Sequence, residues 1–80
     1  MSVCVVRKLE GIGFHPPGRL IALAGRYFRT YEYSDGVVQI RETNNGGVWE
    51  GPWIIPGNMH NLDKALAKLE EMFAKEPDHG

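Results

Sequence analysis

The chain has 80 residues, enough for one hydrophobic core but not for two. Hydrophobic residues make up 42% and charged residues 24%, which excludes a disordered tail, a collagen-like repeat and a coiled coil. The formal net charge of −1 excludes a generic polycation that coats nucleic acid. We therefore expect a single folded domain over residues 1–80.

The cysteine content and the short apolar runs indicate the compartment. A secreted domain of this size usually carries several disulfides, whereas Cys4 is the one cysteine of this chain. Because Cys4 lies in the apolar segment 3–6, we expect a buried and unreactive thiol. That segment is too short for a signal peptide, and no stretch approaches the roughly 18 apolar residues of a membrane span. These features predict a cytoplasmic protein.

The first part of the chain predicts two strands joined by an irregular segment. Residues 2–9 are rich in β-branched side chains, which favours a strand. Residues 11–18 hold three glycines and two adjacent prolines, which exclude a regular element there. Residues 19–24 are ambiguous between a short helix, favoured by leucine and alanine, and a strand, favoured by the sequence after them. We expect the strand.

The clearest hairpin signal lies in residues 26–43. Asp35 and Gly36 separate two runs of strand-forming residues and suit a two-residue turn, whose central positions require a positive φ. This turn makes one face of the hairpin apolar and the other mostly polar, a division that specifies the register. The expected pairs are Tyr33 with Val38, Tyr31 with Ile40 and Arg29 with Glu42 on the apolar face, and Glu32 with Gln39, Thr30 with Arg41 and Phe28 with Thr43 on the polar face.

A second turn signal, centred on residues 45–46, follows this hairpin. Residues 48–50 then favour a strand that Pro52 interrupts, because proline cannot donate a hydrogen bond to a neighbouring strand. The interruption predicts an edge strand or a bulge. We expect residues 53–55 to resume the strand and residues 56–57 to end it.

Residues 59–75 predict an amphipathic helix. Its apolar positions recur at spacings of three and four and form one stripe, and Asn58 or Asn61 can cap its first turn. The stripe must be buried against the sheet, and residues 76–80 are expected to form a flexible tail. The expected fold class is α+β: an antiparallel meander of three to four strands with one C-terminal amphipathic helix packed across the sheet. The stripe consists of Met59, Leu62, Leu66, Leu69 and Phe73.

The sequence contains no residue pattern with the spacing of a catalytic or metal site. The histidines at positions 15, 60 and 79 are not paired at helical or strand spacing, and one cysteine cannot supply a zinc motif. Nucleophilic catalysis by Cys4 would need an exposed thiol, which its apolar neighbours disfavour. Glu70 and Glu71 are adjacent and therefore point in different directions on a helix. We expect a binding protein that is not an enzyme and needs no metal or cofactor.

Charged and aromatic residues are unevenly distributed. Residues 1–41 hold six basic and three acidic side chains, whereas residues 42–80 hold three basic and seven acidic ones. Five of the six basic residues in the first part are arginine, which binds phosphate and carboxylate in a planar, bidentate way, although ordinary surface ion pairs explain this charge equally well. Trp49 and Trp53 either cap the core or, together with Phe28, anchor a partner.

The middle of the chain runs from Arg26 across the turn at residues 35–36 to the strand ending Ile40, Arg41 and Glu42. A second hairpin and a C-terminal amphipathic helix follow. In these features residues 26–75 resemble the positive-cofactor family of transcriptional coactivators, which bind single-stranded DNA. The second hairpin of this chain has no lysine, whereas that of the family is lysine-rich. The resemblance implies a homodimer that holds the strand on a curved sheet through basic and aromatic residues, here Phe28, Arg41 and Trp49.

The chain as a whole is also similar in type to the small phage-encoded inhibitors of CRISPR surveillance complexes, because it is a near-neutral α+β domain without a catalytic centre. Our first expectation is therefore an inhibitor that blocks a nucleic-acid-binding surface of a CRISPR-Cas nucleoprotein complex. The alternative is a dimeric module that binds single-stranded DNA. The partner-binding residues expected for the inhibitor are Trp49, Glu50, Trp53, Glu70 and Glu71, and the nucleic-acid-binding residues of the alternative are Phe28, Arg29 and Arg41.

Overall fold

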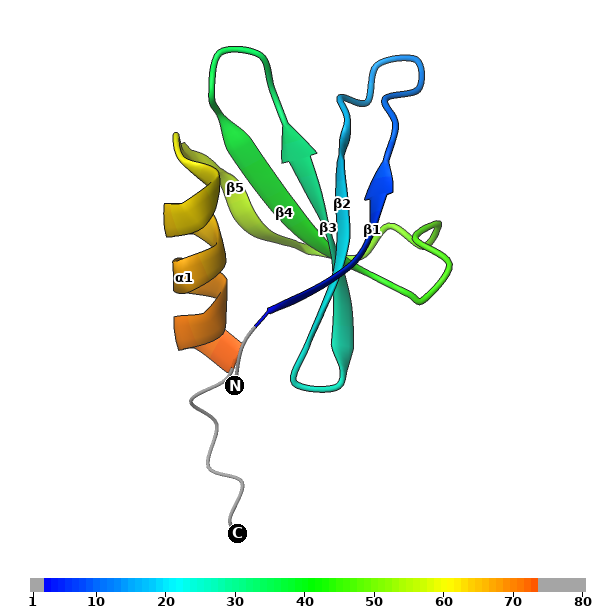
Figure 1. The fold of residues 1–80 in the computed structure, drawn as a ribbon, viewed down its shortest axis with the longest axis vertical. Helices are drawn as coiled ribbons and strands as arrows, with labels where there is room; N and C mark the ends of the chain where they lie inside the picture. The colour runs from blue at the N-terminus through cyan, green and yellow to red at the C-terminus, as the bar shows by residue number, and fades with distance from the viewer. Residues whose placement is uncertain (1–2, 74–80) are drawn as a thin grey trace, which may run out of the picture.

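The computed structural model describes residues 3–73. Over these residues it shows one antiparallel sheet of five strands in chain order and one helix after the last strand (Figure 1). The α+β class and the C-terminal helix are confirmed, while the sheet has five strands rather than three or four. The elements are β1 (Cys4–Leu9), β2 (Gly18–Leu23), β3 (Arg26–Glu32), β4 (Val38–Thr43), β5 (Trp53–Met59) and α1 (Leu62–Phe73).

The two N-terminal strands lie where the sequence predicts them. The ambiguous segment 19–24 is a strand, because β2 lies between β1 and β3 and pairs with both. β1 is an edge strand, and its Val5 and Val6 side chains are 49% and 42% exposed. The prediction of a buried Cys4 is wrong, since α1 packs mainly on β4 and β5 and leaves the thiol exposed.

The loop between β3 and β4 has three residues rather than the predicted two. The N–H of Tyr33 donates to the carbonyl of Val37 at 2.9 Å, which leaves residues 34–36 as the loop. Gly36 supplies the positive φ, at 97°, that such a loop requires at its third position. The carboxylate of Asp35 accepts a hydrogen bond from the N–H of Val37 at 3.1 Å and stabilises this longer turn.

The longer loop shifts every pair between β3 and β4 by one residue, so the predicted pairs are wrong. Phe28 faces Glu42 rather than Thr43, and Arg29 faces Arg41 rather than Glu42. Because successive side chains of a strand alternate between faces, those of β3 exchange faces relative to the prediction. Phe28 is therefore buried in the core, with 0% exposure, and Arg29 lies on the opposite face of the sheet.

The segment between β4 and β5 forms no strand at residues 48–50, contrary to the prediction. The turn centred on residues 45–46 is confirmed, since the N–H of Gly47 donates to the carbonyl of Asn44 at 2.9 Å. The side-chain oxygen of Asn44 then accepts a hydrogen bond from the N–H of Val48 at 3.2 Å. This N–H is therefore not available for pairing with a neighbouring strand. Residues 44–52 thus form an irregular segment, which we call the covering segment.

β5 continues through residues 56–57, which the sequence predicts as its end. The strand lies at the edge of the sheet, so Pro56 can be accommodated without removing a hydrogen bond to a second neighbour. Gly57 has a φ of 110°, which only glycine adopts easily, and the pairing of β4 with β5 shifts register here. The predicted stop is thus a local irregularity within an edge strand.

The helix α1 begins three residues after its predicted start, because Met59 is still part of β5. Asn61 caps the helix, with its side-chain oxygen 3.1 Å from the N–H of Lys64. The apolar stripe packs on the sheet and buries Ala65 and Leu69. Residues 74–75 of the predicted helix and the predicted tail 76–80 lie outside the described residues.

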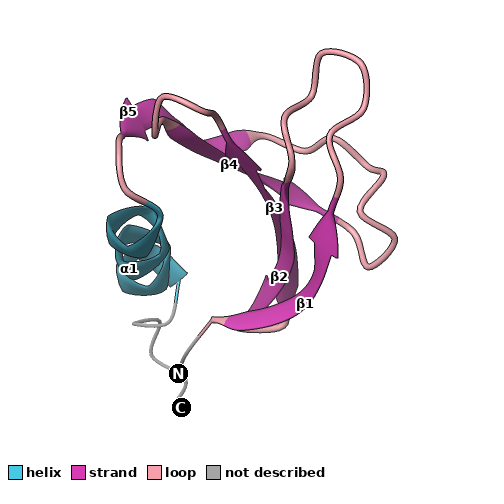
Figure 2. Ribbon diagram, turned by 45° about the horizontal axis from the view of Figure 1, so that its top comes forward, coloured by secondary structure: helices cyan, strands magenta, loops and turns pink. Residues whose placement is uncertain are grey.

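The sheet curls around the side on which α1 lies, and the hydrophobic core fills the space between them (Figure 2). Phe28, Ile40 and Leu69 are completely buried there, and the ring of Phe28 lies 5.2 Å from that of Phe73. We call the face of the sheet that is turned away from α1 the outer face. Loops, and not the helix, lie over this face.

Replacing Phe28 with alanine tests the observed register. We expect the free energy of unfolding to fall by about 3–5 kcal/mol, because the substitution leaves a cavity in the core. Phe14→Ala is the matched control: the ring of Phe14 is 101% exposed, and its loss should change the free energy of unfolding by no more than ~0.5 kcal/mol. Urea denaturation measures both, and equal stability of the two variants would contradict the placement of Phe28.

Candidate binding site

A second, smaller group of buried side chains lies on the outer face of the sheet. Leu20, Tyr31 and Thr43 are 0%, 4% and 6% exposed, although the core under α1 is formed by other residues. The covering segment shields this group: a Cβ atom at Gly47 would lie only 3.8 Å from the Leu20 side chain. The covering segment therefore acts as the second layer that the outer face lacks.

Backbone and side-chain hydrogen bonds hold the covering segment on the sheet. The N–H of Gly51 donates to the carbonyl of Glu42 at 2.9 Å. The carbonyl of Gly51 accepts two hydrogen bonds from the guanidinium of Arg41, at 3.0 and 2.8 Å. Near the other end, Arg7 donates to the carbonyl of Gly46 at 3.2 Å. Arg41 thus has a structural role and also borders the surface described next.

Two arginines face each other across β3 and β4 on the outer face. Arg29 and Arg41 are cross-strand partners. The guanidinium carbon of Arg29 lies 4.6 Å from the ring centre of Tyr31, and that of Arg41 lies 4.3 Å from the ring centre of Trp53. Both distances are within the range of a cation–π interaction. A flat, positively charged group thus covers one face of each ring.

The aromatic rings on this face form a row. The ring centre of Tyr31 lies 5.6 Å from that of His15 and 5.3 Å from that of Trp53. Trp53 is 42% exposed, so part of this row is open to a ligand, and Trp49 in the covering segment is 53% exposed. We call Arg29, Tyr31, Arg41 and Trp53 the arginine–aromatic surface.

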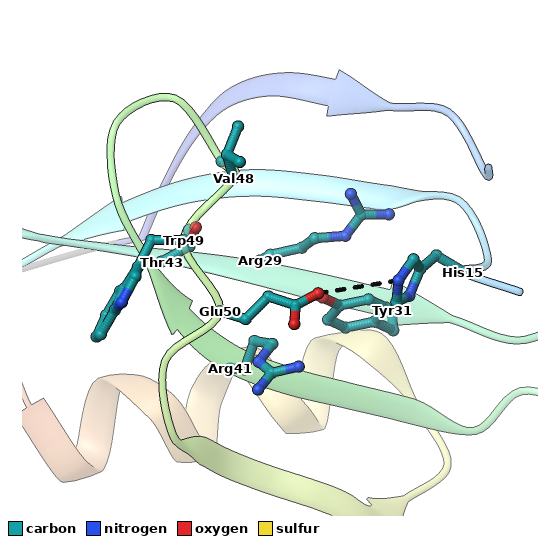
Figure 3. A pocket seen from close by; sticks show the side chains of 9 residues that line it. His15, Arg29, Tyr31, Arg41, Thr43, Val48, Trp49 and Glu50 are labelled. Atoms are coloured by element: carbon teal, nitrogen blue, oxygen red, sulfur yellow. Dashed lines mark ion pairs between the residues drawn. The ribbon is translucent and has the colours of Figure 1, made fainter. Parts of the chain in front are cut away.

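The arginine–aromatic surface carries positive charge at its centre. In residues 3–73, neither Arg29 nor Arg41 forms an ion pair with a carboxylate. The nearby Glu50 is directed at His15 instead, with 3.9 Å between its carboxylate and Nε2 of the imidazole (Figure 3). Like charges directly opposite each other on neighbouring strands are destabilising. The two guanidinium groups therefore form a place where an anion is favoured.

A cavity of about 100 Å³ lies between the two arginines and the covering segment (Figure 3). Its lining includes both guanidinium-bearing side chains, Tyr31, Thr43 and residues 47–50. Two buried side-chain atoms, Nε of Arg29 and Oγ1 of Thr43, have no hydrogen-bond partner within the described part of the chain. Both belong to side chains that line this cavity, although the two atoms themselves are covered by neighbouring protein atoms.

The structure brings together five of the residues predicted for the two binding functions. Trp49, Glu50 and Trp53, predicted for a protein partner, lie on the outer face with Arg29 and Arg41, predicted for nucleic acid. These residues come from β3, β4, the covering segment and the start of β5. One surface therefore combines the arginines and the tryptophans that the sequence singled out separately.

The other three predicted residues lie elsewhere. Glu70 and Glu71 are on α1, across the sheet from the arginine–aromatic surface, and both are engaged within the chain. Glu70 accepts a hydrogen bond from the N–H of Val3 at 2.8 Å, and Glu71 lies 3.6 Å from the ammonium of Lys68. Phe28 is buried in the core, so the prediction of a surface position for its ring is wrong.

Sequence reasoning missed Tyr31, His15 and Thr43 as site residues. The predicted two-residue turn puts Tyr31 on the core face instead of the outer face. The signal that favours the longer loop is Gly36, because a glycine is common at the third position of a three-residue loop. His15 lies in the irregular segment 11–18, where paired backbone hydrogen bonds with Ile12 of 3.0 and 2.9 Å fix its position. No sequence pattern indicated that this segment approaches β3.

Comparison of this chain with protein-family models, with curated proteins and with solved structures finds no match. Within residues 3–73, no group of three or more His, Cys, Asp or Glu side chains is placed to hold a metal ion. No helix among the described residues has the length and apolar character needed to cross a membrane.

Replacing Gly51 with alanine tests how the covering segment is seated. A Cβ atom here would lie 2.8 Å from the carbonyl oxygen of Glu42 and would press on the ring of Trp49. We expect the free energy of unfolding to fall by about 1–3 kcal/mol, together with a shift in tryptophan emission.

The matched control for this substitution is Gly46→Ala in the same segment. Its Cβ atom would meet Asn44 at an ordinary 3.6 Å, so stability should change by at most ~0.5 kcal/mol. Denaturation and emission spectra that are the same for both variants would contradict the close seating of Gly51.

Proposed function

We propose that this chain is a non-enzymatic module that binds single-stranded nucleic acid on its arginine–aromatic surface. The observation that carries the proposal is the cross-strand pair Arg29 and Arg41, in which each guanidinium group lies over an aromatic ring. Phosphates provide the negative charge that this pair attracts, and unpaired bases stack both on aromatic rings and on guanidinium planes.

The cost of the arginine pair supports an anionic ligand. Two opposed positive side chains reduce the stability of the hairpin, and a salt-bridging residue at either position would remove that cost. The rings of Tyr31 and Trp53 and the carbonyl of Gly51 offset part of it. Binding of a polyanion would offset the rest, which gives the arrangement a function that a purely structural pair lacks.

A single strand suits this surface better than a duplex. The bases of a duplex are stacked on one another and cannot reach exposed rings such as Trp53, whereas those of a single strand can. Neutralising about two phosphates should give a log–log salt dependence with a slope of about −1.4, since each phosphate of a single strand contributes roughly −0.7. This shallow slope agrees with a chain whose net charge is −1.

The resemblance to the positive-cofactor family supports the same proposal. Arg41, in the strand ending that carries the resemblance, lies on the arginine–aromatic surface, and Trp49 lies beside it. Phe28 is buried and takes no part, and in our proposal Trp53, which is 42% exposed, supplies the stacking ring instead, while Tyr31 packs beside it at 5.3 Å between ring centres.

Two substitutions test this proposal by fluorescence anisotropy with a labelled single-stranded oligonucleotide at several salt concentrations. Trp53→Leu should weaken binding by about 5- to 150-fold, which corresponds to about 1–3 kcal/mol for the loss of one base–aromatic stack. Arg41→Gln should also weaken binding and should reduce the salt slope by about 0.7, because one phosphate contact is lost.

Arg26→Gln is the matched control, since it removes the same charge from the other side of the sheet. Arg26 lies 5.0 Å from the ring centre of Phe73 on α1 and pairs with Glu42 at 3.8 Å. Its replacement should change the affinity by no more than about twofold, because salt screens distant charges. Equal losses for Arg26→Gln and Arg41→Gln, or a duplex bound as tightly as the single strand, would contradict the proposal.

A second proposal, an inhibitor of a CRISPR-Cas nucleoprotein complex, is favoured by the exposed apolar tip of the covering segment. Val48 and Trp49 are 78% and 53% exposed beside two arginines, a composition typical of hot spots in protein interfaces. If this tip docks on such a complex, Trp49→Ala should restore CRISPR immunity in cells that express the chain, whereas a substitution of the exposed Lys64 on α1, Lys64→Glu, should not. Full immunity in the presence of the unmodified chain would exclude this function.

A further inference from the structure

We propose that the cavity between Arg29, Arg41 and Thr43 binds a phosphate monoester, the group at the phosphorylated end of a nucleic-acid strand. This inference rests on the proposed function and assigns a chemical group to the cavity beneath the arginine–aromatic surface. It predicts that the protein distinguishes a phosphorylated strand end from a hydroxyl end.

The cavity wall has unused hydrogen-bonding capacity. Thr43 is 6% exposed, lines the cavity, and its hydroxyl has no partner among residues 3–73. Nε of Arg29 is likewise buried and unpartnered, although the terminal nitrogen of the same guanidinium donates to the carbonyl of Pro16 at 2.9 Å. Both atoms are covered in the present structure, so a ligand would reach them only after the side chains turn towards the cavity. Because buried polar groups in proteins are nearly always paired, two unpaired groups on side chains that line one cavity point to a ligand that accepts their hydrogen bonds.

The charge of the cavity favours a phosphate. The guanidinium groups of Arg29 and Arg41 approach the cavity from neighbouring strands and have no carboxylate partner in the described chain. Arginine presents its donors in a plane that matches two oxygens of a phosphate. A phosphate monoester is close to doubly charged at neutral pH and offers three terminal oxygens, enough for both arginines and the Thr43 hydroxyl.

The shape of the cavity favours a terminal phosphate over an internal one. Its volume of about 100 Å³ is suited to a small group, and residues 47–50 and His15 stand on its rim (Figure 3). An internal phosphodiester continues into a nucleotide on both sides and therefore needs an open groove. A terminal phosphate has only one such continuation, so it can enter while the first base stacks on the exposed ring of Trp53 outside.

Among the described residues, Glu50 is the one carboxylate in the cavity wall, and its charge opposes an incoming phosphate. Its side chain is 58% exposed and is held by a 3.9 Å contact with His15, so it can turn towards solvent when a stronger anion enters. The present position of Glu50 thus marks where negative charge is favoured, and Glu50→Gln should strengthen phosphate binding.

The test is an NMR titration of the ¹⁵N-labelled full chain with thymidine 5′-monophosphate, with thymidine as the matched ligand that lacks the phosphate. We expect saturable shifts of the Arg29 Nε–H signal and of the Thr43 amide with the monophosphate only. Thr43→Val should weaken binding by about tenfold, the expected effect of losing one hydrogen bond to a charged group. Because this variant replaces an unpaired buried hydroxyl with a methyl group, the fold should be retained.

Three outcomes would overturn the inference. These are equal shifts with thymidine and the monophosphate, a monophosphate affinity that Thr43→Val leaves unchanged, and inorganic phosphate bound as tightly as the monophosphate, which would assign the cavity to free phosphate. Oligonucleotides with a 5′-phosphate and a 5′-hydroxyl end separate this inference from the proposed function. Equal binding of both would leave the single-strand proposal standing and reject the end site, while binding of neither would reject the proposed function.

Discussion

The register between β3 and β4 is the constraint on which the rest of the structure depends. It is set by the three-residue loop, in which Gly36 adopts a φ of 97°. This register turns Phe28 into the core beneath α1 and places Arg29 opposite Arg41 on the other face. With a loop one residue shorter, Arg29 would face Glu42 and form an ordinary ion pair, and no cationic surface would exist. The loop residues themselves are exposed and do not line the cavity of the site, yet they determine its composition.

The covering segment follows from the same register. The outer face carries Leu20 and Tyr31, which are too apolar to remain in contact with water, and α1 is already packed on the other face. A sheet with one helix therefore needs a second cover, and residues 44–52 provide it without forming a strand. Arg41 links the two roles of this face, because its guanidinium binds the carbonyl of Gly51 and also lies over Trp53. One side chain thus holds the covering segment and also belongs to the proposed binding surface.

Much of the fold could be predicted from periodicity, but the site could not. The stripe of α1 and the strand-forming runs identified the α+β class, because each follows from local spacing. The residues around Gly36 permit either a two-residue or a three-residue loop. Which of the two forms decides the face on which every side chain of β3 lies. The contact of His15 with Tyr31 and the burial of Thr43 depend on long-range packing that no local pattern encodes. Arg41 was identified from the strand ending that carries the family resemblance, and Trp49 and Trp53 were identified as large aromatics that can anchor a partner; neither argument depends on the register.

Tryptophan fluorescence tests the binding of a single strand on the arginine–aromatic surface most directly, because the only two tryptophans, Trp49 and Trp53, both lie at the proposed site. In a Trp49→Phe variant all tryptophan emission comes from Trp53. We expect an unlabelled single-stranded oligonucleotide to quench this emission in a saturable way, at the same concentrations that raise the anisotropy of a labelled strand. Binding detected by anisotropy with Trp53 emission unchanged would place the strand elsewhere on the protein and contradict the proposed binding surface.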